Sequence, residues 1–203
     1  MTFLYNQDYN EVNTVAIIQD ICANVLGYQK YLELEVEYPI SEKRCDMAIF
    51  IDKKRKCLIE VKAIRLNNIH IEKFVLQAVQ YGIDIDINCV VLTNARIWYV
   101  YWINFEDPKV VPKCLFKFDI LDSRTTIIVR CFQYLAKEHI THFIEDQIAV
   151  DKLNATKKRT SYNKSPKILR FCRKLCSGVK FVMILHAILL DIKKSISQSK
   201  KDL

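Results

Sequence analysis

Glycine and proline are scarce in this chain, which has three Gly and four Pro among its 203 residues. Disordered and low-complexity segments are usually rich in these two residues and poor in apolar ones. Here 51% of the residues are hydrophobic, so the composition excludes a largely disordered protein. A chain of this length can bury one sizeable core and carry a small appendage.

The chain also lacks any Cys-x-x-Cys pair, although it contains eight cysteines. Four of them lie within apolar runs: Cys22, Cys57, Cys89 and Cys131. A thiol in such a run behaves as a small hydrophobic side chain. Residues 1–5 show neither the basic segment nor the long apolar segment of a secretory signal. We therefore expect reduced thiols and a cytoplasmic location, because disulfides are rare in the cytosol.

No apolar run is long enough to cross a membrane, which takes about 20 residues. The most apolar stretch, residues 179–190, is interrupted by Lys180 and His186. We expect a packing helix there and consider membrane contact the weaker interpretation. Because basic residues flank the stretch on both sides, docking on a partner or on a membrane surface stays open as an alternative role.

Positive charge is concentrated in the C-terminal quarter. Residues 151–203 hold 14 Lys and Arg but 3 Asp and Glu, a net charge of +11, so residues 1–150 carry −3 of the total of +8. Such asymmetry indicates a polyanion partner. The candidate phosphate contacts are Lys157, Lys158, Arg159, Lys164, Lys167, Arg170, Arg173 and Lys174. The alternative is that the run from 157 to 167 is a solubilising linker.

Hydrophobic spacing predicts an α/β (α+β) protein with a mixed central sheet flanked by helices. The predicted helices cover residues 10–27, 69–82, 125–136 and 142–150. The predicted strands cover residues 32–38, 45–51, 57–62, 89–93, 97–102 and 115–120. We place a domain over residues 1–150, followed by a basic linker and C-terminal helices over 151–203.

Two of these strands carry charged residues where a core strand should be apolar. Asp46 lies near the start of the first, and the second ends in Glu60-Val61-Lys62. Because successive side chains of a strand point to opposite faces, Glu60 and Lys62 share one face and Val61 lies on the other. Taken alone, Asp46 is also compatible with a turn residue, and Glu60 with Lys62 is compatible with an exposed ion pair.

The register between the two strands decides whether the two carboxylates converge. Residues directly opposite on antiparallel strands share a face. If Asp46 faces Glu60, then Ala48 must pair with Leu58. That pairing requires a connecting loop of odd length around residues 52–54, whereas an even loop would separate the carboxylates. We therefore predict an odd-length loop.

This combination of residue types suits a divalent metal ion. Asp46 and Glu60 supply the oxygen ligands that Mg²⁺ or Mn²⁺ prefers, and the backbone carbonyl of Val61 is a candidate third ligand. A bound metal ion lowers the pKa of water and offsets the charge of a phosphodiester. Lys62 is placed to orient the attacking water or to stabilise the phosphate electrostatically.

The order Asp46, then Glu60-x-Lys62, resembles the PD-(D/E)xK nuclease superfamily. Within it, the chain is similar to the N-terminal nuclease domain of the motor (R) subunit of type I restriction enzymes and to small stand-alone relatives. The resemblance covers roughly residues 10–120. Three further positions fit supporting motifs of this family: Glu11 on the first helix, and Gln77 and Tyr81 in a helical Gln-x-x-x-Tyr motif.

The next strands also fit the family in part. Residues 92–95, Leu-Thr-Asn-Ala, stand where the family has a strand ending in Thr-Asn-Gly, and an aromatic strand follows in both cases. Two positions depart from the pattern, because Cys45 replaces Pro and Ala95 replaces Gly. No Gly-x-x-x-x-Gly-Lys-Ser/Thr phosphate loop is present, so we do not expect a complete restriction subunit with its motor.

The resemblance implies a restriction-endonuclease-like fold and a Mg²⁺-dependent (or Mn²⁺-dependent) DNA endonuclease. In that interpretation Glu11, Gln77 and Tyr81 support the site. The implied partners are DNA and a restriction–modification or helicase protein, with a homodimer as one candidate assembly. One alternative is a catalytically silent nucleic-acid-binding module of the same fold. The other is an interaction protein that uses the stretch 179–190.

Overall fold

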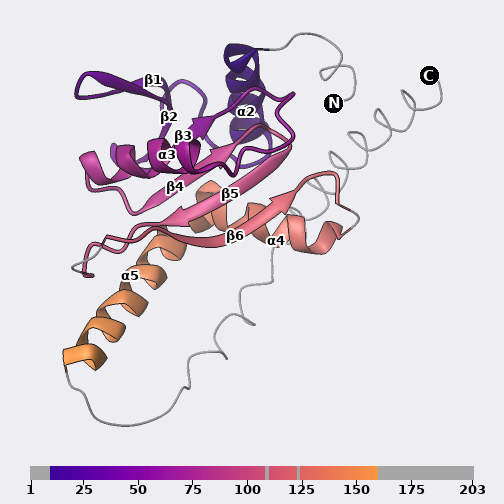
Figure 1. Cartoon of the computed structure of the whole chain (residues 1–203). Coiled ribbons are helices and arrows are strands. Elements are labelled where there is room, and N and C mark those ends of the chain that lie inside the picture. The colour runs from indigo at the N-terminus through magenta and orange to yellow at the C-terminus, as the bar shows by residue number, and fades with distance from the viewer. Residues whose placement is uncertain (1–9, 108–109, 123, 160–203) are drawn as a thin grey trace, which may run out of the picture.

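The computed structural model describes residues 10–107, 110–122 and 124–159 (Figure 1). Its helices are α2 (Glu11–Asn24), α3 (Glu72–Asp84), α4 (Thr125–Leu135) and α5 (Lys137–Arg159). Its strands are β1 (Leu34–Ile40), β2 (Lys43–Ile51), β3 (Lys54–Val61), β4 (Cys89–Thr93), β5 (Ile97–Trp102) and β6 (Lys113–Asp119). The expected helix over residues 179–190 lies outside the described residues.

The six strands form one mixed sheet in the order β1-β2-β3-β4-β5-β6. Strands β3 and β4 are parallel, and the other neighbouring pairs are antiparallel. A parallel pair needs a crossover connection, and α3 supplies it between β3 and β4. The described fold is therefore the mixed α/β sheet flanked by helices that the sequence predicted.

The two faces of this sheet are covered differently. Apolar residues of α2, α4 and α5 pack on one face, against side chains such as Met47, Ile59 and Trp98. On the other face α3 packs through Ala78 and Val79. The strand residues of this cluster include Leu58, Val90 and Leu92. We call these the three-helix face and the α3 face. Asp46 and Glu60 lie on strands whose even-numbered residues Ala48 and Leu58 belong to the α3 face.

The pairing of β2 with β3 confirms part of the predicted register. Ala48 pairs with Leu58 as predicted, but the connection is a tight two-residue turn at Asp52 and Lys53, between the paired residues Ile51 and Lys54. Both turn residues have positive φ, 51° and 60°, which matches the twist of a tight hairpin. The predicted odd-length loop is thus wrong, because a bulge after Ile49 takes up the extra residue.

Several predicted boundaries also shift. The strand predicted to begin at residue 32 begins at Leu34, because residues 30–33 form a turn in which the Leu32 and Glu33 N–H groups donate to the Gln29 carbonyl. The helix predicted to begin at 69 begins at Glu72.

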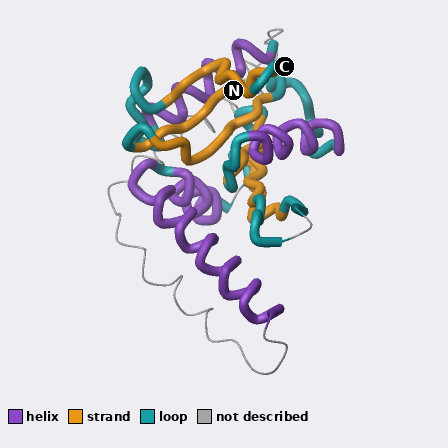
Figure 2. The backbone as a smooth tube through the Cα atoms, turned by 90° about the vertical axis from the view of Figure 1, so that its left-hand side faces the viewer, coloured by secondary structure: helices purple, strands orange, loops and turns teal. Residues whose placement is uncertain are grey.

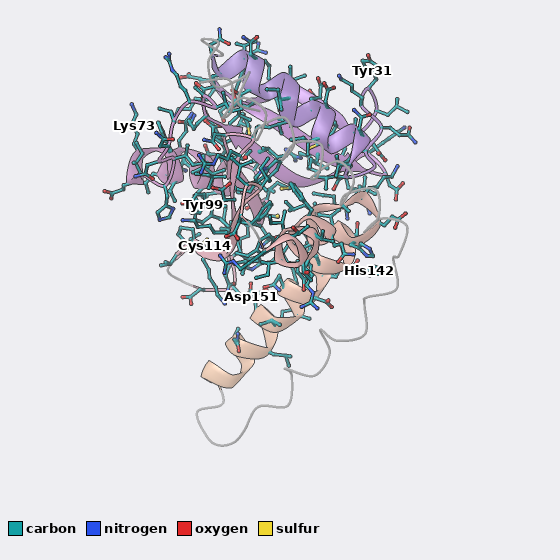
Figure 3. The ribbon with its side chains drawn as sticks, turned by 90° about the vertical axis from the view of Figure 1, so that its right-hand side faces the viewer. Tyr31, Lys73, Tyr99, Cys114, His142 and Asp151 are labelled. Atoms are coloured by element: carbon teal, nitrogen blue, oxygen red, sulfur yellow. The ribbon has the colours of Figure 1, made fainter. Side chains whose placement is uncertain are left out.

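The last helix, α5, differs most from its predicted range. It spans Lys137–Arg159 rather than 142–150, so it runs through the predicted domain boundary and includes the first three residues of the predicted linker. It projects beyond the rest of the described chain (Figures 1 and 2). Figure 3 shows Asp151 where the helix leaves the body, and there its carboxylate accepts a 2.6 Å hydrogen bond from the Trp102 indole. Within the described part of the chain, no helix has both the length and the apolar character needed to cross a membrane.

Candidate metal centre

Glu60 is the most deeply buried acid of the site. It lies one residue before the end of β3, and only 2% of the residue is exposed. Its Oε1 accepts a 2.7 Å hydrogen bond from the Lys62 ammonium. Its Oε2 is buried and is the one such side-chain oxygen or nitrogen without a hydrogen-bond partner among the described residues. A buried carboxylate oxygen without a partner costs free energy unless a cation or proton meets it.

Asp46 reaches the same place from β2. The β2–β3 ladder ends at the pair Met47 and Ile59, so Asp46 lies just beyond it. The Asp46 Oδ2 accepts a 2.7 Å hydrogen bond from the Val61 N–H. This side-chain bond replaces a ladder bond and points the carboxylate toward the end of β3. The observed contact of Val61 is through its N–H; its carbonyl as a metal ligand stays a prediction.

Glu11 adds a third carboxylate from the first turn of α2. Its Oε1 lies 2.9 Å from the Lys62 Nζ, and its side chain is about half exposed. Oxygen atoms of Glu11, Asp46 and Glu60 all lie within 4.8 Å of one another. The structure thus brings together three acids that are far apart in the sequence, at the end of β3, in a cluster small enough to surround one metal ion.

Lys62 follows directly after β3 and is buried among these acids. Its ammonium bridges Glu60 and Glu11 and lies 5.0 Å from the ring centroid of Phe74 on α3. Burial disfavours the charged ammonium, but the hydrogen bonds and charges of Glu60 and Glu11 outweigh burial and raise the pKa of Lys62. The side chain is therefore a cation held at a fixed place.

The acids carry raised pKa values because they are buried together. Burial, followed by the negative charge of Asp46, raises the pKa of Glu60 to about 7. Burial also raises the pKa of Asp46, although the hydrogen bond from Val61 opposes this shift. Near neutral pH the cluster therefore holds more negative charge than its surroundings stabilise, and a cation would relieve the repulsion.

Gln77 and Tyr81 contact each other on α3. The Gln77 amide donates a 3.2 Å hydrogen bond to the Tyr81 hydroxyl, as their spacing of four residues allows. Tyr81 is buried in the α3 face, and burial, with a smaller contribution from the charge of Glu60, raises its pKa. Among the described residues neither side chain hydrogen-bonds to Asp46 or Glu60. The charge of Glu60 therefore reaches Tyr81, but no hydrogen bond joins the pair to the carboxylates among the described residues.

Two residues that the sequence did not single out as site residues fix the loop that follows Lys62. The Thr14 hydroxyl on α2 accepts a 3.1 Å hydrogen bond from the Ile64 N–H. The Asn94 amide, fully buried, donates a 2.7 Å bond to the Leu66 carbonyl. Thr14 stands three residues after Glu11, on the same helix face, and this spacing was the available signal.

The turn after β4 contains Ala95, at the position where the PD-(D/E)xK pattern has glycine. Ala95 has φ 68°, in the left-handed region that favours glycine. Its N–H donates to the Thr93 hydroxyl at 3.1 Å, and its carbonyl accepts from the Trp98 indole at 3.0 Å. These two bonds hold an unfavourable backbone conformation in place, so the turn forms without glycine.

The predicted phosphate contacts of the C-terminal quarter lie at or beyond the end of the described chain. The backbone of Lys157, Lys158 and Arg159 belongs to the last turn of α5. Lys164, Lys167, Arg170, Arg173 and Lys174 lie outside the described residues.

No protein-family model matches this chain, and comparison with curated proteins and with solved structures finds no significant match either. The functional interpretation therefore depends on the geometry of the site and on the motif resemblance of the sequence.

Proposed function

We propose that this protein is a Mg²⁺- or Mn²⁺-dependent DNA endonuclease with a restriction-endonuclease-like fold of the PD-(D/E)xK type. The observation that carries the proposal is the orphaned Oε2 of Glu60, buried beside the carboxylates of Asp46 and Glu11. Three carboxylates lie close together here, and the one of Glu60 has a buried oxygen without a hydrogen-bond partner. Such a site fits a hard cation that takes oxygen ligands. An ordinary surface ion pair would leave no such oxygen buried.

In this proposal Asp46 and Glu60 hold the metal ion, and Glu11 and the Val61 carbonyl complete its protein ligands. When bound, the metal ion acidifies a water molecule and offsets charge on the scissile phosphate. Lys62 has a separate task. Its ammonium is fixed between two carboxylates and the Phe74 ring, so it can stabilise the phosphate or orient the water without reorganising.

The remaining elements support this chemistry. Gln77 and Tyr81 keep α3 packed beside the carboxylates, and the basic C-terminal residues add affinity for the DNA backbone that does not depend on sequence. We propose a cytoplasmic protein that works with a restriction–modification or helicase partner. The candidate assembly of this chain itself is a homodimer.

The test is cleavage of supercoiled and linear plasmid DNA in Mg²⁺ and in Mn²⁺. We expect the wild-type protein to nick or cut only with metal. Removing one electrostatic group of this kind typically lowers the rate by about 10²–10³-fold, which is the effect expected for Lys62→Gln and for Glu60→Gln. Lys54→Gln at the exposed start of β3 and Glu42→Gln in the exposed β1–β2 turn are matched controls that should cut like wild type.

Two results would contradict the proposal. Cleavage that persists in Lys62→Gln and Glu60→Gln would place the activity elsewhere or in a contaminant. Binding of DNA and metal by a wild-type protein that cuts neither substrate would favour the catalytically silent module of the same fold.

A further inference from the structure

A second polar cluster lies on the α3 face, toward the opposite edge of the sheet from Asp46. The strand registers define a row of residues that runs across the α3 face of the sheet from the metal centre to this cluster. Glu60 pairs with Leu92, Leu92 with Tyr99, and Tyr99 with Lys117. Because directly paired residues point to the same face, this row leads from the buried carboxylate to a lysine on the edge strand β6. Three strand spacings of about 4.8 Å separate its ends, or about 14 Å.

The far end of the row is an ordered stack of side chains. The His70 ring stacks on Tyr99 with 4.8 Å between centroids and lies nearly parallel to Tyr101. The His70 Nδ1 is 2.7 Å from the Tyr101 hydroxyl, which fixes the orientation of the imidazole. The Lys117 Nζ lies 5.1 Å from the Tyr99 ring centroid, in cation–π contact.

Two residues of the stack also reach solvent. Lys117 and His70 are exposed, whereas Tyr99 and Tyr101 beneath them are buried. Among the described residues no acid pairs with Lys117, and the Nε2 of His70 makes no hydrogen bond. The stack therefore holds the Lys117 ammonium and the His70 ring above two buried tyrosines. The ammonium and the His70 Nε2 are available to a ligand.

His70 is also tied to the metal centre through the chain. It lies in the segment between Lys62 and α3, and this segment is fixed at its start by the Thr14 and Asn94 hydrogen bonds. Leu92, between the metal centre and the stack, is fully buried. A ligand that reaches both ends must therefore pass over the residues that cover Leu92, and it must be longer than a single phosphate group.

We infer that His70 and Lys117, supported by Tyr99, form a second subsite that binds the phosphate backbone of an unpaired nucleic-acid strand whose scissile phosphate lies at the metal centre. This inference rests on the proposed function and deepens it by assigning the path of the substrate. A nucleic-acid strand carries negative charge at regular intervals, so it can place one phosphate at Glu60 and a later one about 14 Å away at Lys117. The exposed imidazole adds a flat ring on which a base can stack.

The test measures binding of a fluorescent single-stranded oligonucleotide to the full chain by anisotropy, in Ca²⁺, between about 50 and 200 mM salt. Lys117→Gln should weaken binding several-fold and lower the slope of log K against log salt by about 1, as loss of one phosphate contact does. Lys113→Gln is the matched control, because Lys113 is exposed on the same strand but pairs with Trp102, which belongs to the three-helix face. The control should bind like wild type. His70→Gln is a second variant and should also weaken binding.

The subsite is overturned if Lys117→Gln and Lys113→Gln show equal affinity and equal salt slope, or if the wild-type protein does not bind the oligonucleotide. Thermal melting of each variant separates lost binding from lost folding, and a folded His70→Gln with wild-type affinity would remove His70 from the subsite. Failure of the proposed function looks different. In that case the wild-type protein binds the strand and Lys117→Gln still lowers the slope, but the strand is not cut in Mg²⁺ or Mn²⁺.

Discussion

The two faces of the sheet differ in the charged residues that they carry, although the same strands build both. On the three-helix face the strands present apolar side chains to α2, α4 and α5. On the α3 face the strands also pack apolar side chains against one helix, but β2 and β3 place Asp46 and Glu60 beside this apolar cluster. Alternation along a strand lets one face supply the packing free energy while the other accepts charged groups that packing alone would reject.

The difference between the faces separates residues that stabilise the fold from residues that we propose for activity. The three-helix face buries apolar side chains of the sheet against α2, α4 and α5. The α3 face contains two buried charged residues, Glu60 and Lys62. Functional sites typically hold charged groups in unfavourable surroundings, and replacing such a group often stabilises the protein. Replacing a carboxylate of the metal centre should therefore leave stability equal or raise it, whereas replacing a buried apolar residue of the three-helix face should lower it.

The largest expected effect is on the three-helix face. Trp98 is fully buried and packs edge-on against Phe132 at 5.2 Å between centroids. Trp98→Ala should lower the free energy of unfolding by about 3–5 kcal/mol, because it removes a large side chain and leaves a cavity. Asp46→Ala on the α3 face should leave the metal-free stability equal or higher. Urea denaturation of both variants measures the contrast, and a similar loss in both would show that the two faces do not differ as described.

A smaller effect should appear in the pH dependence of metal-free stability. Because the pKa of Glu60 is raised from 4.5 to about 7, the folded state binds a proton that the unfolded state releases in this range. Its contribution to stability is thus fully present below about pH 4.5 and is lost as the pH rises through about 7, an effect of a few kcal/mol at most.

Thermal melting from pH 4.5 to 7 measures this, with Glu60→Gln as the comparison, since glutamine does not titrate. We expect the wild type to lose stability across the range, Glu60→Gln to lose less, and added Mg²⁺ or Mn²⁺ to reverse the loss in the wild type only. Parallel curves for the two proteins would show that Glu60 is not the titrating group.

The packing of α3 can be tested at Gly82. A Cβ there would lie 2.5 Å from Ile103 Cδ1, 2.7 Å from Val90 Cγ2 and 2.8 Å from the Ile87 carbonyl oxygen. Gly82→Ala should therefore cost about 1–3 kcal/mol by overpacking, even though alanine favours a helix. Chemical denaturation measures the loss, and Gly27→Ala is not a suitable control because Gly27 has φ 83°. Stability equal to or above the wild type would show that α3 does not lie this close to β4.

How far the sequence predicts this structure depends on the range of the contacts involved. β4 and β5 occur as predicted, because each is an apolar run bounded by turn residues, and such signals are local. The carboxylate cluster was also predicted, from the alternation of β3 and from the motif order. The β2–β3 loop was not, since counting residues between pairs assumes an unbroken ladder, and the bulge after Ile49 breaks it.

Long-range contacts account for the other differences. The helix predicted from residue 69 starts later because its N-cap, Ile71, has an extended backbone (φ −104°, ψ 146°). The preceding residue, His70, is fixed by its ring, which stacks on Tyr99 and bonds to Tyr101. Neither partner is near it in sequence, so no spacing rule finds the stack or the subsite. Helix α5 extends past its predicted end because Lys157, Lys158 and Arg159 suit a helix as well as a linker, and composition alone does not separate the two.

The smallest expected effect concerns the helix that carries Glu11. The Asn10 side chain caps α2 by accepting a 3.1 Å hydrogen bond from the Asn13 N–H, and the Asn10 carbonyl accepts from the Thr14 hydroxyl at 3.0 Å. Asn10→Ala should cost about 1 kcal/mol, whereas Asn10→Ser should keep most of the cap. Because Glu11 is the first residue of this helix, fraying should also weaken metal affinity in Asn10→Ala, which calorimetric titration with Mn²⁺ measures. A loss of stability with unchanged affinity would show that Glu11 is not a ligand, and the metal ion would then be held from the sheet alone, by Asp46 and Glu60.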